Sequence, residues 1–281
     1  MKIGIVGLGL IGGSFALATS RRTPHRVFGY DTDDETMRRA FSDGAIEEAL
    51  TRENVGEMDV LLLAVVPHLA VEFTRSNAER IRGLVIDLCG IKRTVSEAIR
   101  PLAKAHGFSY LGGHPMAGRE HGGYENAAEI MFDGASMILV PHETIPAWVN
   151  GYLEALGFRT VKISTDEEHD RMIAFTSQMA HVVSNNYCKS ETGQDHQGFS
   201  ADSLRDLTRV AGLNAKMWTE LFIENGDYLL KEVDRLIEDI TKMRNAIADK
   251  DRVALERMLE EGSRAKYRLF PKGVACDKYP S

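Results

Sequence analysis

His114 is the residue of this sequence best placed to do chemistry. It lies in a run of small and apolar residues, Gly-Gly-His-Pro-Met-Ala-Gly, that spans 112–118. Histidine commonly exchanges a proton in enzyme reactions because its pKa lies near neutral pH. The run follows an expected strand at 109–112, at the carboxyl edge where open α/β sheets bind ligands, and its small residues would let a substrate approach. We therefore predict that His114 is a catalytic acid–base group.

A second histidine, His181, belongs to an unusual polar row on an expected helix over 166–190. Residues three, four and seven positions apart share one helix face, and this face carries Asp170, Ser177, His181 and Ser184. A solvated face is normally rich in Lys and Glu. We interpret the row as lining a site, while internal hydrogen bonds at an interface are the alternative. The core-facing residues of this helix are expected to be Met172, Phe175, Met179 and Val183.

Arg209 and Trp218 follow in the helical half of the chain and suit a pocket for an organic anion. An arginine binds a carboxylate through two parallel hydrogen bonds, but Arg209 could equally pair with Asp206 or Asp202. Trp218 could wall the pocket or pack in the core. The histidines expected at the surface, at element ends, are His25, His106, His142 and His169, and His68 after the third strand has no assigned role.

The cofactor signal lies at the start of the chain, where a strand runs into Gly7, Leu8, Gly9, Leu10, Ile11 and Gly12. In this G-x-G-x-x-G spacing the first glycine permits a tight turn, the second lets a pyrophosphate approach, and the third lets helix and strand pack closely. Asp31, at the end of the second strand, is suited to bind the adenine ribose hydroxyls. Because Asp31 would repel a 2′-phosphate, we predict NAD as cofactor, with NADP as the alternative because Arg38 and Arg39 lie near.

The elements that position these residues alternate between strands and helices up to about residue 165. Apolar runs predict strands at 2–6, 26–30, 58–65, 84–88, 109–112, 136–140 and 160–163, with helices at 14–20 and 33–41. Only helical patterns follow, at 166–190, 201–211, 215–225 and 227–248. We predict an α/β protein with a Rossmann-type, doubly wound parallel sheet over 1–165, and an all-α substrate and dimerisation domain over 166–281.

The last of these helices carries two rows of apolar residues seven positions apart. The rows are Leu229, Leu236 and Met243, and Val233, Ile240 and Ile247. Such a double stripe packs either against its own domain or against a partner subunit. We expect a homodimer formed through the C-terminal helices. The tail from Pro271 to Ser281 has little pattern and is expected to be loosely held.

Composition excludes several classes of protein. The chain has 281 residues, 43% of them hydrophobic, and a net charge of −7. This argues for a globular protein and against nucleic acid or a membrane surface as the main partner. No apolar run approaches the roughly 18 residues of a membrane helix. The widely spaced Cys89, Cys188 and Cys276 form no disulfide or metal pattern, so we expect no metal and a cytoplasmic location.

Together these motifs resemble the prephenate dehydrogenase family, the prephenate and arogenate dehydrogenases of tyrosine biosynthesis. The resemblance runs from Met1 to the last amphipathic helix and rests on G-x-G-x-x-G, on His-Pro-Met-Ala-Gly at 114–118, on the segment 206–211 and on Met217-Trp218. It implies an NAD-dependent enzyme that removes a hydride and a proton from the carbinol group of prephenate and releases CO2, giving 4-hydroxyphenylpyruvate. Neither an appended regulatory domain nor a mutase module is expected.

The resemblance also implies roles for individual residues. His114 would take the proton of the substrate hydroxyl, and His181 would help to position the substrate from the helical domain. Arg209 would hold a substrate carboxylate and Trp218 would shape the pocket. Glu120 is similar to the family's gating carboxylate.

One segment departs from the family pattern. The family often has Asp-x-x-Ser-x-Lys after the fourth strand, with the Ser touching both the catalytic His and the substrate. Here 87–92 reads Asp-Leu-Cys-Gly-Ile-Lys, so Gly90 stands in place of that Ser. Its hydrogen bond would come from Cys89, from a water or from nothing. Lys92 matches the pattern and would bind the substrate anion or orient the His114 loop.

Two other functions stay open on the sequence. Arogenate dehydrogenase would perform the same chemistry on an amino instead of a keto side chain. A non-catalytic NAD sensor is the alternative from another class. Replacing His114 by Ala would leave a sensor intact but would slow a dehydrogenase about 100-fold or more.

Overall fold

The computed structural model describes residues 1–270, so the expectations about the tail from Pro271 and about Cys276 lie outside the described residues. The chain forms two compact units, one of residues 1–229 and one from Leu230 onward. All strands of the described part belong to the first unit, and the last strand ends at Ile163. The domain boundary near residue 165 stays a prediction.

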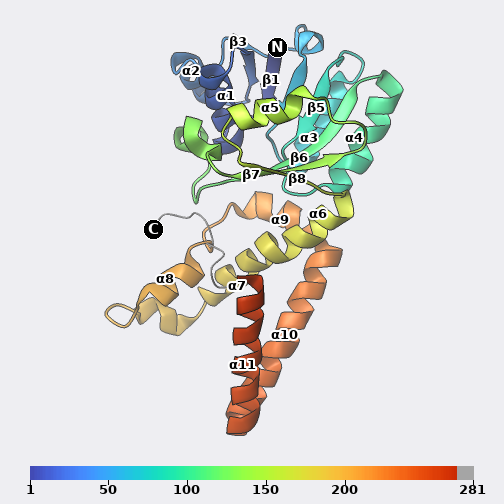
Figure 1. The fold of residues 1–281 in the computed structure, drawn as a ribbon. Helices are drawn as coiled ribbons and strands as arrows, with labels where there is room; N and C mark the ends of the chain where they lie inside the picture. Colours follow the sequence, from blue (N-terminus) through green and yellow to red (C-terminus); the bar gives the residue numbers. More distant parts are fainter. Residues whose placement is uncertain (271–281) are drawn as a thin grey trace. The chain divides into compact units, whose positions relative to one another are not determined.

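The first unit is built on one eight-stranded sheet, shown as arrows in Figure 1. The order β3-β2-β1-β4-β5-β6-β7-β8 places β1 inside the sheet, with the chain winding outward in both directions, as in Rossmann-type folds. The strands are β1 (Lys2–Val6), β2 (Arg26–Tyr30), β3 (Glu48–Ala49), β4 (Val60–Leu63), β5 (Leu84–Asp87), β6 (Ser109–Met116), β7 (Ser136–Pro141) and β8 (Thr160–Ile163). The predicted strands are confirmed, and the two-residue β3 was not expected.

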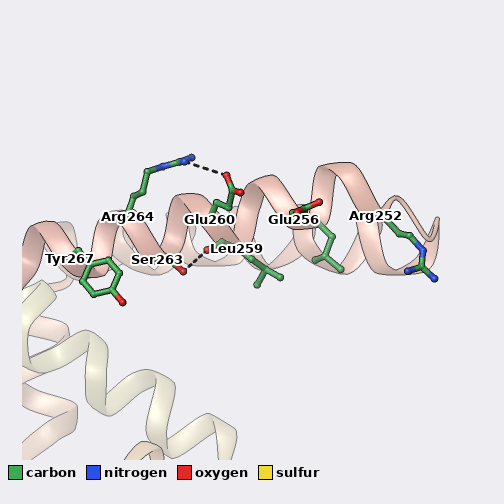
Figure 2. Close-up of a pocket in the computed structure, with 8 residues that line it drawn as sticks. Arg252, Glu256, Leu259, Glu260, Ser263, Arg264 and Tyr267 are labelled. Carbon is green, nitrogen blue, oxygen red and sulfur yellow. Dashed lines mark hydrogen bonds and ion pairs between the residues drawn. The ribbon is translucent and has the colours of Figure 1, made fainter.

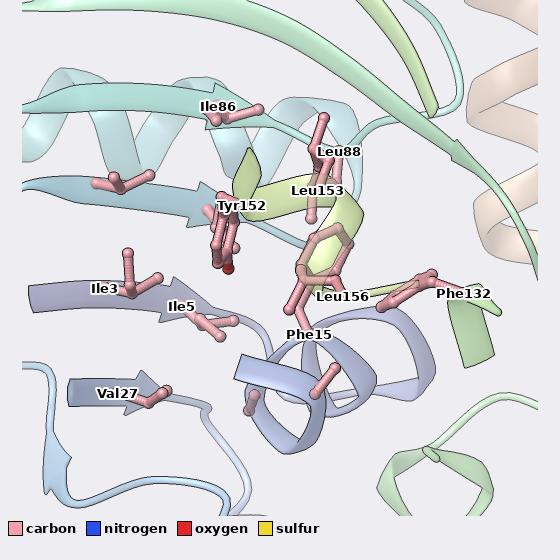
Figure 3. Packing of buried hydrophobic residues seen from close by; sticks show 14 of the residues in the cluster. Ile3, Ile5, Phe15, Val27, Ile86, Leu88, Phe132, Tyr152, Leu153 and Leu156 are labelled. Carbon is pink, nitrogen blue, oxygen red and sulfur yellow. The ribbon is translucent and has the colours of Figure 1, made fainter. Parts of the chain in front are cut away.

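Helices cover both faces of the sheet. They are α1 (Leu10–Arg22), α2 (Asp34–Ser42), α3 (Pro67–Asn77), α4 (Arg93–His106) and α5 (Trp148–Ala155). Successive strand residues point to opposite faces, so Leu62 belongs to the core with α1 and α5 whereas Leu61 belongs to the core with α3 and α4. In the first core, Phe15 of α1 packs against Phe132 with ring centroids 4.4 Å apart (Figure 3).

The sheet is parallel as predicted, except at one pair of strands. β6 and β7 run antiparallel, and β8 is parallel to β7. The antiparallel partner lets β6 continue well beyond its last parallel pair with β5, Asp87 with Gly112. His114 therefore lies inside a strand, opposite Ile138, and not in a loop after it.

The helical part of the first unit follows β8. Its helices are α6 (Asp166–Ile173), α7 (Met179–Tyr187), α8 (Asp202–Thr208), α9 (Ala215–Glu224) and the start of α10 (Gly226–Ala248). The predicted helix over 166–190 is present, but a π-helical turn at Ala174–Gln178 separates α6 from α7. Thr165 caps α6 by accepting a hydrogen bond from the backbone N–H of Glu168.

The second unit contains the rest of α10 and α11 (Arg252–Leu269), a helix that the sequence analysis did not predict. Asp251 caps α11 by accepting a hydrogen bond from the backbone N–H of Ala254. Figure 2 shows residues that line a hollow along α11: in this view the Leu259 and Tyr267 side chains lie on one side of the helix, and the Glu260–Arg264 ion pair of 3.3 Å lies on the other. Within residues 1–270, no helix combines the length and the apolar character needed to cross a membrane.

Candidate active site

The glycine-rich loop between β1 and α1 has the shape that a dinucleotide requires. Gly7 has a φ of +85°, in the left-handed region that favours glycine, and a Cβ at Gly12 would lie 1.8 Å from the Gly7 carbonyl oxygen. A Cβ at Gly9 would meet no atom within 4 Å, so the loop is open where a pyrophosphate would approach. No side chain caps the N-terminus of α1, which leaves its first N–H groups available to an anion.

Asp31 lies at the end of β2 and holds this loop in place. One carboxylate oxygen accepts a hydrogen bond from Leu8 N at 2.7 Å, and the other accepts one from Asp33 N at 3.0 Å. Each carboxylate oxygen has a second lone pair. Asp31 can therefore fix the loop and still accept hydrogen bonds from ribose hydroxyls.

His114 lies at the same edge of the sheet as the glycine-rich loop. The register aligns Val6, Leu63, Asp87 and Gly112 in one row across four neighbouring strands. Gly7 is one residue beyond this row and His114 is two residues beyond it. The structure thus brings the predicted cofactor loop and the predicted proton acceptor to one carboxyl edge.

His114 contacts a second histidine that we had expected at the surface. The Nδ1 atom of His114 lies 2.9 Å from Nε2 of His169, and His169 is 2% exposed. Its other ring nitrogen, Nδ1, lies 2.8 Å from Oδ1 of Asp170. The prediction of a surface position for His169 is wrong, because its polar neighbours suggested a solvated helix start, whereas α6 turns this side chain toward β6.

Asp170 anchors this pair of histidines to the segment between β5 and α4. Its carboxylate accepts hydrogen bonds from the backbone N–H of Lys92 at 2.7 Å and of Arg93 at 3.0 Å, and the Arg93 guanidinium lies 3.2 Å away. Burial by itself would raise the pKa of Asp170, but the bonds from His169 and the two backbone groups lower it below its ordinary value. Asp170 is therefore an ionised carboxylate inside the protein.

Both histidines are neutral near pH 7. Burial lowers the pKa of His114 well below its ordinary value, and the nearby His169 and Lys92 lower it further. Burial also lowers the pKa of His169, although Asp170 offsets part of this effect. A neutral imidazole has one nitrogen able to accept a proton, as a general base requires.

Lys92 is completely buried and its ammonium group points into the sheet. It forms an ion pair with Asp87 and donates a hydrogen bond of 2.7 Å to the carbonyl oxygen of Gly113, next to His114. This position fits the second of the two expected roles, orientation of the His114 segment, and not contact with the substrate.

The glycines before His114 also serve the protein's own packing. A Cβ at Gly112 would lie 3.1 Å from Cδ of Lys92, and a Cβ at Gly113 would lie 2.9 Å from the Asp87 carbonyl oxygen. The two glycines therefore make room for the buried Lys92–Asp87 pair. That the small residues around His114 also let the substrate approach stays a prediction.

The segment in which Gly90 stands in place of the family Ser follows β5, at the same carboxyl edge of the sheet. Cys89 is buried, and its Sγ donates to the Val65 carbonyl oxygen at 3.5 Å. Burial, with the Asp87 charge, raises the pKa of this thiol well above its ordinary value. The Cys89 thiol is thus engaged with the segment after β4, and Leu221 of α9 lies next to Gly90.

A second group of predicted residues gathers in the helical part. His181 of α7 donates a hydrogen bond from Nδ1 to the Val210 carbonyl oxygen at 2.8 Å, and its ring lies 3.8 Å from that of Trp218. Burial lowers the pKa of His181, and the Arg209 charge lowers it further. His181, Trp218 and Arg209 therefore share one neighbourhood. The two acids proposed as partners of Arg209, Asp202 and Asp206, both lie within ion-pair distance of Arg205.

The π turn overturns the expected polar row on this helix. Each residue of an α-helix advances by about 100°, so one extra residue in a turn rotates everything beyond it. Asp170, before the turn, faces His169 and α4, whereas His181, beyond it, faces Trp218. The expected core stripe is correct for Met179, which is 8% exposed, and wrong for Met172 and Phe175, which are 44% and 47% exposed.

The remaining candidates are placed as follows. Glu120 lies in an exposed segment after β6 and forms no hydrogen bond or ion pair within residues 1–270. His68 pairs with Glu220 of α9 at 2.8 Å. His142 was expected at the surface, but its side chain is only 12% exposed and stacks on Tyr110.

Comparison with known proteins matches both halves of the chain to one family. The pattern described as "Prephenate dehydrogenase, nucleotide-binding domain" matches residues 15–164. The pattern described as "Prephenate dehydrogenase, dimerization domain" matches residues 165–261. The chain belongs to the prephenate dehydrogenase family. It is an NAD-dependent oxidoreductase with a Rossmann-type domain.

Several relatives are similar over nearly the whole chain. A cyclohexadienyl dehydrogenase of Zymomonas mobilis is 30% identical over 95% of both chains. A prephenate dehydrogenase of Bacillus subtilis is 28% identical over 88% of this chain and 70% of its own. Among solved structures, a Synechocystis arogenate dehydrogenase is 27% identical with a TM-score of 0.77, covering 95% of this chain and all of its own. A prephenate dehydrogenase from A. aeolicus shares the fold with a TM-score of 0.82 at 22% identity, over 96% of this chain and 98% of its own.

Proposed function

We propose that this enzyme converts prephenate and NAD to 4-hydroxyphenylpyruvate, CO2 and NADH in tyrosine biosynthesis. The observation that carries the proposal is a neutral, largely buried histidine, His114, at the sheet edge that also carries the dinucleotide loop. NAD, when bound at Gly7–Gly12, supplies the acceptor for the hydride. The chain itself must bind the substrate and handle its proton.

The proton balance defines what His114 has to do. Loss of hydride from the carbinol carbon and of the hydroxyl proton to His114 gives a dienone. When the bond to the ring carboxylate breaks, its electron pair enters the ring, CO2 leaves, and the carbonyl oxygen becomes a phenolate. The reactants are the prephenate dianion and NAD⁺, and the products are the 4-hydroxyphenylpyruvate monoanion, CO2 and NADH. Atoms and charge are equal on the two sides, so the reaction releases no free proton. His114 therefore holds the proton during the reaction and returns it to the same oxygen.

The helical residues are suited to bind the substrate. Arg209 is proposed to hold a carboxylate by two parallel hydrogen bonds, and Trp218 to wall the pocket beside His181. Glu120, in the exposed segment after β6, is proposed as the gating carboxylate. Lys92 is proposed as a positioning residue, because its ammonium group is buried against Asp87 and Gly113.

Arogenate is the second candidate substrate. The Synechocystis relative is named for arogenate, and the Zymomonas mobilis relative is named for the cyclohexadienyl ring that both substrates contain. The two compounds differ only in the keto or amino side chain, away from the carbinol group. The proposed roles of His114 and the NAD loop are the same for both.

The chain is also proposed to form a homodimer in the cytoplasm through α10 and α11. In the second of the two predicted rows on α10, Val233 is half-buried, whereas Ile240 and Ile247 are 57% and 60% exposed. On α11, Leu259 and Tyr267 are 55% and 50% exposed beside the hollow of Figure 2. Apolar side chains in such number on two helices favour burial against a second copy.

The proposed function is tested by initial rates of NADH or NADPH formation with prephenate or arogenate, each offered with NAD or NADP. We expect strong turnover of prephenate with NAD, and a loss of about 100-fold or more in His114→Ala with unchanged NAD binding. Preference for arogenate would identify arogenate, the second candidate, as the substrate. No turnover of any pair by protein that binds NAD would reject both.

A further inference from the structure

The hydrogen bonds around His114 fix where its proton lies. The Asp170 carboxylate can only accept, so the Nδ1 of His169, 2.8 Å away, must carry the proton of that bond. A neutral His169 then has a lone pair on Nε2. Since this atom lies 2.9 Å from Nδ1 of His114, His114 must donate there.

We propose that His169 and Asp170 are positioning residues that hold His114 as the Nδ1–H tautomer, with Nε2 as the proton acceptor for the substrate hydroxyl. The proposal rests on the proposed function for its substrate, but the tautomer itself follows from the hydrogen bonds alone. Within residues 1–270, Nε2 of His114 forms no hydrogen bond, so this nitrogen is available for that step. A histidine oriented by a second group and a carboxylate follows the same logic as other acid–base sites.

We call the hydrogen-bonded chain of His114, His169 and Asp170 the relay. It also explains how a buried site tolerates an additional proton. When His114 takes the hydroxyl proton at Nε2, it becomes an imidazolium whose Nδ1–H still points at His169. Asp170 supplies the negative charge at the other end of the chain of bonds. No bond of the relay has to break, and the proton leaves again from Nε2 when the phenolate forms.

The backbone holds the relay rigid. Two backbone N–H groups, of Lys92 and Arg93, point at the Asp170 carboxylate, and the Arg93 guanidinium lies beside it. Asn225 donates to the Asp170 carbonyl oxygen at 2.9 Å. The other charged groups near the two histidines are Lys92 and Asp87, which pair with each other. The relay is therefore built into the fold by residues from the segment between β5 and α4, from α6 and from the end of α9.

Nitrogen-15 NMR of histidine-labelled full-length protein tests the tautomer without any substrate. We expect His114 at neutral pH to show a protonated Nδ1 and an unprotonated Nε2, and His169 to show a protonated Nδ1. A protonated Nε2 on His114 would overturn the proposal. Because this readout needs no turnover, it remains decisive even if the enzyme prefers another substrate.

Two substitutions test the function of the relay. His169→Gln keeps an oxygen that can accept from His114 Nδ1–H, so we expect its kcat within about 10-fold of the wild type and the same tautomer. His169→Leu removes the acceptor, so we expect kcat to fall about 100-fold or more, with KM nearly unchanged and an altered acid limb of the pH profile. His142→Leu, at another partly buried histidine bonded to Ser96, serves as the control and should change neither. Wild-type kcat and pH profile in folded His169→Leu would refute the proposal.

Discussion

Gly90 lies next to Leu221, and the space between them is large enough for one additional carbon atom. A Cβ built at Gly90 would lie 3.5 Å from both Cδ atoms of Leu221, an ordinary packing distance, and Gly90 has no positive φ. The position is therefore not restricted to glycine by its backbone or by its surroundings. The absence of the family Ser is therefore not imposed by a steric limit.

This relationship predicts that Gly90→Ser folds normally and gains activity. The hydroxyl would add one hydrogen bond at the substrate edge, and a typical net gain of about 1 kcal/mol corresponds to an increase of about fivefold in kcat/KM. Gly90→Ala is the matched control, since it adds the same Cβ without the hydroxyl. Equal kcat/KM in the Ser and Ala variants would show that the hydroxyl has no partner.

The pH dependence of kcat/KM should reflect the burial of His114. The base must be neutral, and its pKa lies well below the ordinary 6.5 because burial disfavours the imidazolium. We expect kcat/KM to stay level as the pH falls through 6.5 and to decline only at lower pH. Initial rates across the acid range measure this. A decline centred at or above 6.5 would contradict the effect of burial.

Asp31 should control the choice between NAD and NADP. Asp31→Asn keeps an oxygen for Leu8 N but removes the charge that repels a 2′-phosphate. A charge repulsion of about 1–2 kcal/mol at an exposed site predicts that the preference for NAD falls about 10-fold. Asp33→Asn is the control, because Asp33 caps α2 through Thr36. If the ratio of kcat/KM for NAD to kcat/KM for NADP were unchanged in Asp31→Asn, Asp31 would not be the residue that sets the preference for NAD.

Removal of the Lys92 ammonium should destabilise the fold. Lys92→Met leaves the buried Asp87 carboxylate without its cation, and breaking a buried pair typically costs about 3–5 kcal/mol. The free energy of unfolding from urea titration measures this. The double variant Lys92→Met/Asp87→Asn should recover part of the loss. If Lys92→Met instead retained its stability and raised KM, the ammonium would contact the substrate, as the family resemblance had also allowed.

The apolar residues of α10 should hold the dimer together. Ile240→Glu/Ile247→Glu places two charges at exposed apolar positions, so we expect a monomeric mass by light scattering at micromolar concentration, where we expect the wild type to be a dimer. Lys242→Glu is the control on the same helix, since Lys242 forms exposed ion pairs of small energy. A wild-type monomer at that concentration would refute the proposed homodimer.

Features of this protein that depend on a local pattern could be predicted from its sequence. The apolar runs of β1, β4 and β5 specify strands buried on both faces, and the spacing of Gly7, Gly9 and Gly12 specifies a dinucleotide turn. The residues at 114–118 also pointed to the family, and they carry the histidine proposed as the proton acceptor. These signals are local because each depends on residues adjacent in one element.

The partners of His114 could not be predicted from the sequence, because they are set by tertiary contacts. His169 is 55 residues from His114 in the chain, and its neighbours in sequence are polar. It reaches His114 because α6 packs beside α4 and because the antiparallel β7 lets β6 extend past the parallel edge. The π turn that separates Asp170 from His181 is also not marked by any periodic pattern of apolar residues in the sequence. Contacts between distant elements depend on packing and crossing geometry, which the order of residues along one helix or strand does not contain.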